Sequence, residues 1–241
     1  MDVVSFKKRH QEGETMSVLV EPSIQETIRI NLSYLRIKRF VDILFTLLTL
    51  PFLIIITIIV AVMIRIDSPG PIFFRQKRVG LNGVEFYMLK FRSMYTNSDD
   101  AIHREAIARY MNGQKISETT SSDLPYKKVD DPRITKVGRF LRKTSIDELP
   151  QFYNVLRGEM TLVGPRPPLP YEVEFYSQHD GLRLYGKPGL TGYWQVYGRS
   201  RVPFASMVEM DIDYLQKQSL REDLKLVLLT VPVMVKGQGG A

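Results

Sequence analysis

The 241-residue chain contains no cysteine. Disulfides, thiolate metal sites and a cysteine nucleophile are therefore excluded together. Histidine is also scarce, because only His10, His103 and His179 occur and they share no regular spacing. A zinc site built on histidines is not expected from so scattered a set.

The sequence also lacks the short glycine-rich signatures of several large enzyme classes. It has no Gly-x-Ser-x-Gly elbow, no Walker-type loop and no Gly-x-Gly-x-x-Gly turn. Basic residues outnumber acidic ones, and the formal net charge is +7. This charge favours an anionic partner: nucleic acid, a phosphorylated substrate or an acidic membrane. No nucleic-acid-reading motif accompanies it, so no nucleic-acid partner is expected.

A long uncharged run follows the first 42 residues. Residues 43–64, ILFTLLTLPFLIIITIIVAVMI, are 22 residues without a charge. That length suits a bilayer-spanning helix, and a buried helix of a soluble protein is the alternative. Pro51 predicts a kink or break near Leu47–Pro51, because proline cannot donate to the helical ladder.

Basic residues flank the run about equally on both sides, so the positive-inside rule gives no orientation. They are Arg29, Arg36, Lys38 and Arg39 before the run, and Arg65, Arg75, Lys77 and Arg78 after it. A segment that enters one leaflet, bends and returns keeps both flanks on one anionic surface. We therefore favour a re-entrant helix over a spanning one.

The motif Lys38-Arg39-x-x-Asp42 stands where the apolar run begins. Asp42 follows the two bases by four and three residues, so it is expected to face them on a helix. A carboxylate near lipid is costly without such a partner. A plain juxtamembrane basic cluster is the alternative, and it leaves Asp42 unexplained.

The rest of the chain predicts a polar tail and one compact domain. We expect a tail over 1–35, a membrane-inserted helix over 36–66 and a catalytic domain over 67–241. The catalytic domain is expected to begin with a turn at 67–71, followed by short strands at 72–76 and 85–91 that are joined as a hairpin. A helix is predicted at 99–111 within a hydrophilic segment, and a basic amphipathic segment at 139–143. An apolar stretch at 223–235 is too short to span a membrane. The fold class is α+β, mainly helical, with a small β-sheet and interfacial amphipathic helices.

Two adjacent carboxylates, Asp147 and Glu148, stand in the stretch TSIDELPQ over 144–151. The simple explanation is a helix start, because Ser145 and Glu148 have the spacing of a capping box. A helix is predicted from Ile146 to Arg157, ending at Gly158, with Pro150 in its first turn. The acids then lie at the helix N-terminus, where anions are favoured.

The helical wheel places Asp147, Gln151 and Asn154 on one face, with Glu148 pointing to its side. The opposite face, formed by Leu149, Phe152, Tyr153 and Leu156, is expected to anchor the helix in the core. The polar face is then either the wall of a site or a solvated surface.

Arg166 stands in the stretch Gly164-Pro-Arg-Pro167. The prolines stiffen the chain around it, which preorganises its guanidinium for a phosphate or carboxylate. A rigid loop whose arginine pairs with a structural acid is the alternative. Farther on, the glycine- and aromatic-rich loop ending at Arg199 could also bind phosphate. Lys90 and Arg92 on the second predicted strand are further candidates, although a solvated face explains them equally.

Eight short motifs occur in order: Lys38-Arg-x-x-Asp42, Ser68-Pro-Gly-Pro71, Lys90-Phe-Arg-Ser-Met94, Asp131-Pro-Arg133, Thr144-Ser-x-Asp-Glu-Leu-Pro150, Asn154-Val-Leu-Arg-Gly-Glu159, Val163-Gly-Pro-Arg-Pro167 and Pro188-Gly-x-Thr-Gly192 followed by Gly198-Arg199. Together they resemble the bacterial sugar transferases, the monotopic phosphoglycosyl transferases. The likeness runs from about residue 36 to 235.

The resemblance implies a reaction in which a sugar-1-phosphate passes from a UDP-sugar to undecaprenyl phosphate with release of UMP. It implies Asp147 as nucleophile, Glu148 as a Mg²⁺ ligand, and Arg166 and Arg199 as phosphate contacts. It also implies that the protein is located at the cytoplasmic face of the bacterial inner membrane. A homo-oligomer is compatible with the sequence, and a non-enzymatic membrane adaptor is the competing interpretation.

The chain departs from the family at the membrane helix. The family usually breaks this helix with Ser-Pro about twelve residues after the aspartate, whereas Pro51 follows Asp42 by nine and is preceded by Thr49-Leu50. The bend is therefore expected to be shifted.

Overall fold

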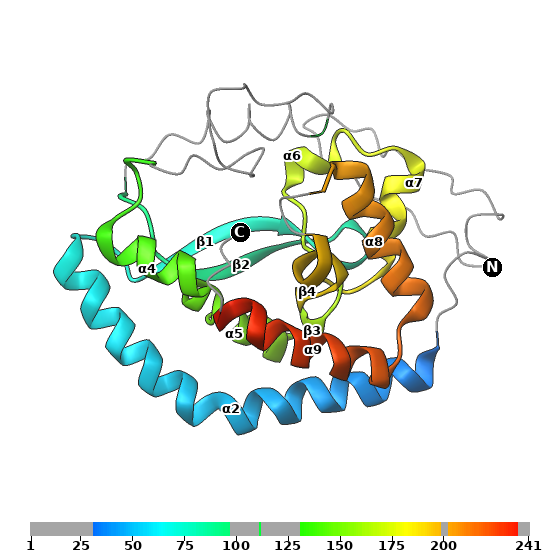
Figure 1. Ribbon diagram of the computed structural model, residues 1–241, viewed down its shortest axis with the longest axis horizontal. Helices are drawn as coiled ribbons and strands as arrows, with labels where there is room; N and C mark the ends of the chain where they lie inside the picture. The colour runs from blue at the N-terminus through cyan, green and yellow to red at the C-terminus, as the bar shows by residue number, and fades with distance from the viewer. Residues whose placement is uncertain (1–30, 97–110, 112–130, 199–201, 236–241) are drawn as a thin grey trace.

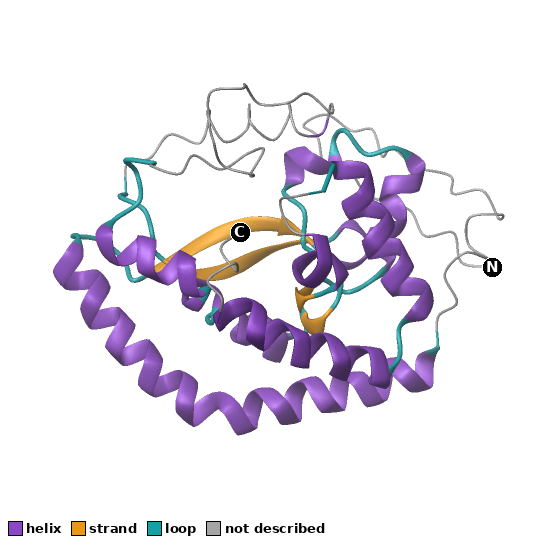
Figure 2. Ribbon diagram, viewed as in Figure 1, coloured by secondary structure: helices purple, strands orange, loops and turns teal. Residues whose placement is uncertain are grey.

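The computed structural model describes residues 31–96, 111, 131–198 and 202–235. Within these ranges the chain is mostly helical, with two small sheets (Figures 1 and 2). The tail up to residue 30 and nearly all of the expected helix at 99–111 lie outside the described residues. The α+β, mainly helical class is confirmed.

The apolar run forms part of α2 (Leu32–Asp67), a single helix of 36 residues. Pro51 lies inside it without breaking it. Two threonines bond back onto carbonyls one turn earlier: Thr46 Oγ1 to Asp42 O (2.7 Å) and Thr49 Oγ1 to Phe45 O (3.0 Å). Proline and such back-bonding both bend helices. Figure 1 shows α2 curving so that both of its ends turn toward the rest of the molecule.

The outer side of α2 is apolar and exposed. In its most apolar stretch only 11% of the residues are buried, so the alternative of a soluble core helix is wrong. Leu48, Phe52 and Ile58 are 72%, 66% and 60% exposed. Of the part of the chain that the structure describes, α2 is the one helix long and apolar enough to cross a membrane. This exposed surface indicates membrane association.

The inner side of α2 carries polar residues that bond to the domain. Lys38 Nζ pairs with Asp223 (2.7 Å) in α9 (Leu220–Val235). Arg39 donates to Val155 O (2.5 Å) and Leu156 O (2.8 Å) in α5 (Gln151–Arg157).

Asp42 accepts from Thr161 Oγ1 (2.5 Å) and Leu162 N (3.2 Å) in β3 (Thr161–Val163). The expectation that Asp42 pairs with Lys38 and Arg39 is therefore wrong. The short sequence spacing was outweighed by partners on other elements.

The predicted hairpin is present. Strands β1 (Phe73–Val79) and β2 (Glu85–Phe91) pair antiparallel from Phe73↔Phe91 to Val79↔Glu85. They are joined by η1 (Leu81–Gly83), in which Asn82 and Gly83 have φ of 55° and 77°. The first strand extends three residues beyond the predicted end, and this extension includes Arg78.

Parallel strands β3 and β4 (Gly189–Thr191) form the second sheet, which the sequence did not predict. It adjoins the main core cluster, in which residues of α8 (Phe204–Lys217) and α9 pack on Leu162 and Val163. The other helices are α4 (Lys136–Thr144), η2 (Ile146–Glu148), α6 (Pro170–Val173), α7 (Gln178–Gly181), η3 (Leu182–Tyr185) and the π-helix η4 (Trp194–Gly198).

Two helices near α2 expose apolar side chains. On α4 the side chain of Phe140 is 49% exposed, and Arg139 and Lys143 beside it are also exposed, which suits a membrane-surface helix. On α9 an exposed row consists of Leu224, Leu228 and Val231. Figure 1 shows α4, α5 and α9 between the curve of α2 and the hairpin.

Candidate active site

The acid pair lies in η2, a short 3-10 turn between α4 and α5. Ser145 precedes it in the left-handed region (φ 57°) and its side chain makes no capping bond. The predicted capping box is therefore wrong, and the turn is closed by the main chain, from Glu148 N to Ser145 O (3.2 Å). Gly158 (φ 80°) ends α5, as predicted, but the single helix expected from Ile146 is divided into η2 and α5, and Pro150 is the N-cap of α5.

The two carboxylates have opposite electrostatic environments. Burial raises the pKa of Asp147 to about 6, although Lys90 and Arg142 act in the opposite direction. Burial also acts to raise the pKa of Glu148, but Lys90, Arg166 and Arg78 together hold it below its usual range. Carboxylates whose environments push their pKa values apart are suited to different roles.

Lys90 on β2 is the nearest cation to the pair. Its Nζ lies 2.7 Å from Glu148 Oε1, and both side chains are largely shielded from solvent. The structure therefore brings one sequence candidate, Lys90, directly onto the acids. Arg92, two residues later, donates instead to Ser68 O (2.6 Å) and Pro69 O (2.8 Å), at the end of α2.

Arg166 lies in the loop after β3, and its positive charge helps to lower the pKa of Glu148. Its Nη1 is 3.4 Å from Glu172 Oε2, and its guanidinium lies 5.4 Å from the centre of the Trp194 ring. It therefore pairs with a structural acid, as the alternative proposed, and at the same time adds positive charge near the acid pair.

Arg78 on β1 belongs to this cationic group, although the sequence pattern indicated only that it lies in the basic flank of the membrane segment. Its side chain is buried and bonds to Gln76 Oε1 (2.7 Å) and Pro167 O (2.9 Å). Burial and the charge of Arg166 lower its pKa to about 10. Two neighbouring guanidinium groups favour an anion between or beside them. The sequence signal for this position of Arg78 is its spacing of two from Gln76, which places both side chains on one face of a strand.

The polar face of α5 is buried. Asn154 donates to Tyr87 O (2.8 Å) and Glu159 Oε2 (2.6 Å) and accepts from Leu89 N (3.0 Å), and Gln151 is 3% exposed. On the apolar face Phe152 and Leu149 pack against core clusters, which confirms the expected anchoring in part, whereas Tyr153 is 52% exposed. Arg199 lies outside the described residues.

The side chains around the acid pair can be compared with the ligands that Mg²⁺ prefers. The described residues contain no group of three or more histidine, cysteine, aspartate or glutamate side chains placed to hold a metal. Mg²⁺ is commonly held by one or two carboxylates together with substrate phosphates. The acid pair beside a cationic group fits that manner of binding, in which the phosphates supply the other ligands.

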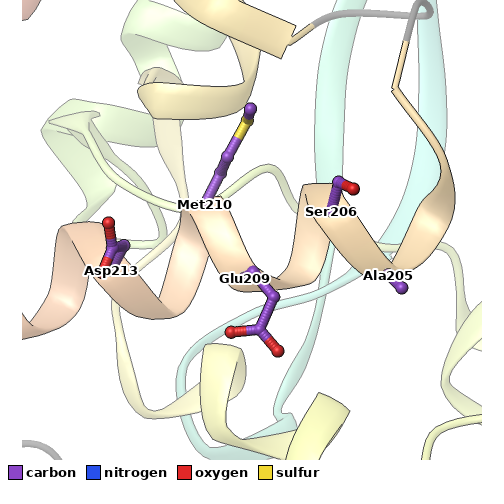
Figure 3. A pocket seen from close by; sticks show the side chains of 5 residues that line it. All are labelled: Ala205, Ser206, Glu209, Met210 and Asp213. Carbon is purple, nitrogen blue, oxygen red and sulfur yellow. The ribbon is translucent and has the colours of Figure 1, made fainter.

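A separate open hollow runs along α8 and is lined by Ala205, Ser206, Glu209, Met210 and Asp213 (Figure 3). None of the predicted site residues lines it. Its two carboxylates already pair with basic side chains, Glu209 with His179 and Asp213 with Lys217.

The chain is similar to known proteins over most of its length. It is 44% identical over 208 residues to galactosyl transferase CpsE of Streptococcus agalactiae, covering 86% of this chain and 44% of that protein. It is 40% identical over 202 residues to the exopolysaccharide production protein ExoY of Sinorhizobium fredii, covering 84% and 87%. It is 38% identical over 206 residues to the UDP-glucose:undecaprenyl-phosphate glucose-1-phosphate transferase of Caulobacter vibrioides, covering 82% and 69%.

The chain thus spans less than half of the first relative and most of the second. A profile described as bacterial sugar transferase matches residues 33–237, which include α2, the acid pair and the Arg166 loop. The chain belongs to the bacterial sugar transferase family.

Proposed function

We propose that this protein is a phosphoglycosyl transferase that moves a sugar-1-phosphate from a UDP-sugar to undecaprenyl phosphate and releases UMP. The observation that carries the proposal is the acid pair: a buried Asp147 and an adjacent Glu148 of opposite pKa shift, beside Lys90, Arg78 and Arg166. Among the relatives, the Caulobacter protein is named for a UDP-sugar donor and this acceptor.

In the first step an oxygen of the Asp147 carboxylate attacks the phosphorus that bears the sugar. The bond from that phosphorus to the bridging oxygen breaks, and its electron pair leaves with UMP. In the second step a phosphate oxygen of the lipid attacks the same phosphorus and the aspartyl–phosphorus bond breaks, which restores the carboxylate. A pKa near 6 leaves Asp147 ionised at neutral pH but more basic than an ordinary aspartate.

The surrounding residues hold charge. Lys90, Arg78 and Arg166 offer positive charge to the diphosphate, and such preorganised charges supply much of the acceleration in phosphoryl transfer. Glu148 would hold a Mg²⁺ ion, which would supply further positive charge to the leaving phosphate. Asp147 is then left free to act as nucleophile, because a metal-bound carboxylate is a weaker one.

We further propose that α2 is re-entrant and that the site lies at the cytoplasmic face of the inner membrane. A straight helix of 36 residues would be about 54 Å long, well over the ~30 Å hydrocarbon core. Both limbs of α2 bond to the same domain: Asp42 to β3 near the start, and Asp67 to Val137 N (3.0 Å) at the end. A spanning helix would have its ends on opposite sides of the membrane.

The test uses the full chain in lipid nanodiscs with undecaprenyl phosphate and a panel of UDP-sugars. Wild type is expected to release UMP from at least one donor, and Asp147→Asn to release none. Without acceptor, a labelled sugar is expected to stay covalently on wild type and not on Asp147→Asn. Normal turnover by Asp147→Asn refutes the assignment.

Two further variants sharpen the result. Glu148→Gln is expected to raise the Mg²⁺ concentration needed for half-maximal turnover, and an unchanged metal response removes Glu148 as a ligand. The exposed Asp213→Asn serves as the matched carboxylate control and is expected to turn over normally. A membrane adaptor, the competing interpretation, predicts no UMP release by any form of the protein.

A further inference from the structure

The backbone of the Arg166 loop is held at four consecutive carbonyls. Each accepts a hydrogen bond from a different residue: Pro165 O from Gly189 N (2.9 Å), Arg166 O from Arg183 Nη2 (3.0 Å), Pro167 O from Arg78 Nη1 (2.9 Å) and Pro168 O from Val79 N (2.9 Å). A proline-stiffened loop bonded in this way has few alternative conformations. The backbone of Arg166 is therefore fixed before any ligand arrives.

The side chain of Arg166 extends from this fixed backbone. It contacts Glu172 Oε2 at 3.4 Å and lies 5.4 Å from the centre of the Trp194 ring. The position of its guanidinium relative to the acid pair therefore depends on where its main chain is held.

Arg183 in η3 is the side chain that reaches the Arg166 carbonyl. It is 1% exposed, and it also donates to Tyr176 OH (2.9 Å) and to the carboxylate of Asp211 in α8. Asp211 is itself fully buried. A buried ion pair is weak evidence for stability, because apolar residues of similar volume often replace it without loss. Its bond to the Arg166 carbonyl offers a specific role.

We propose that Arg183, oriented by Asp211, is a positioning residue that fixes the Arg166 main chain and so aims the Arg166 guanidinium at the donor diphosphate. Asp211 and Arg183 touch no reacting atom, and they act through the loop. The inference rests on the proposed function, since it names what holds one of that site's cations.

A double-mutant cycle tests the inference. Wild type, Asp211→Asn, Arg166→Ala and the double variant are compared for kcat and KM with the UDP-sugar that wild type turns over. Because misplacement by about 1 Å can cost ~100-fold, Asp211→Asn is expected to raise KM about tenfold or more. In the Arg166→Ala background the same change is expected to alter KM less than about twofold, since coupled residues are not additive.

A merely structural role gives a different pattern. Asp211→Asn would then lower activity by the same factor in both backgrounds, and that result overturns the proposal. Asp213→Asn, two residues along the same helix and exposed, is the matched control and is expected to leave KM unchanged. The weaker backgrounds are assayed at raised enzyme concentration.

A second variant covers failure of Asp211→Asn to fold. Arg183→Lys keeps the charge opposite Asp211, but a lysine cannot reach three separate acceptors with the planar fork of arginine. It is expected to give the same coupling to Arg166, and additivity again overturns the proposal. Failure of wild type to release UMP from any donor counts against the proposed function instead, so the two failures are distinguishable.

Discussion

Replacing Asp42 by alanine is expected to loosen the membrane helix from the domain. Asp42 is 3% exposed, and its two carboxylate oxygens accept from Thr161 Oγ1 (2.5 Å) and Leu162 N (3.2 Å). Alanine removes both acceptors and leaves the N–H of Leu162 and the hydroxyl of Thr161 without them.

The magnitude follows from these two bonds. A hydrogen bond to a charged group contributes about 1.5–3 kcal/mol, and the longer bond to Leu162 belongs at the low end. Losing both bonds therefore costs ~4 kcal/mol, reduced to ~3 kcal/mol because the burial of a charge is also relieved. For a domain of this size each kcal/mol corresponds to about 2–4 °C, so the expected fall in Tm is roughly 6–12 °C.

The assay is thermal unfolding in mild detergent, followed by the fluorescence of Trp194, the one tryptophan in the sequence and a buried side chain. Thr161→Val is expected to show about half the effect, and the double variant less than the sum. Asp213→Ala, which breaks an exposed pair with Lys217, is the control and should cost under ~0.5 kcal/mol. A Tm for Asp42→Ala within about 2 °C of wild type contradicts the reasoning.

Three other perturbations have definite expected outcomes. Gly138→Ala should lower Tm, because the new Cβ would lie 2.0 Å from the backbone oxygen of Ser93. Gly181→Ala is the control and should leave Tm unchanged, because no atom lies within 4 Å of its Cβ position. Equal Tm values for the two variants would contradict the packing of α4. Asp147→Asn should raise Tm at pH 8 in the presence of a chelator. The pKa of Asp147 is about 6 in the folded protein and 3.8 in the unfolded chain, so the ionised carboxylate destabilises the folded state and a neutral asparagine does not. The gain in Tm should shrink as the pH falls from 6 to 4, and a gain independent of pH would rule out this cause. Leu228→Asp, on the exposed row of α9, should weaken co-sedimentation with anionic vesicles, and unchanged binding would remove α9 from the membrane surface.

Local features of the fold were predictable because their causes are local. The hairpin follows from two alternating runs around a glycine-containing loop, and the end of α5 follows from Gly158, whose φ of 80° suits glycine. The acid pair was found for the same reason, since two adjacent carboxylates before a proline are visible in eight residues of sequence.

Which face of a helix is buried was not predictable in this way. The helical wheel separated the polar and apolar faces of α5 correctly, but it did not show that the polar face is buried as well. The reason lies on β2, which among the described residues pairs with β1 on one edge alone, so that Tyr87 O and Leu89 N are satisfied by Asn154. On the apolar face Phe152 and Leu149 still pack against core clusters, and only Tyr153 is strongly exposed. Periodicity separates the two faces of a helix, but the partners on other elements decide how deeply each face is buried.

Long-range pairing also hid the role of Arg78. Its position on β1 is set by a register that continues three residues beyond the predicted strand, and its partner Pro167 is 89 residues away. Periodicity places Gln76 and Arg78 on one face but does not say what covers that face. The loop that covers it carries Arg166, so the two arginines become neighbours only in the folded chain.

The contacts of Arg39 connect α2 to α5, the helix that follows the acid pair. Its guanidinium donates to Val155 O (2.5 Å) and Leu156 O (2.8 Å), carbonyls in the last turn of α5. A cation at a helix C-terminus is favoured by the carbonyls of the last turn and by the macrodipole. Asp147 and Glu148 lie just before the first turn of this same short helix, so Arg39 fixes the position of the acids relative to α2. Under the proposed function a soluble donor and a lipid-bound acceptor meet at these acids, and Arg39 would then contribute to catalysis by holding them at a constant distance from the membrane helix.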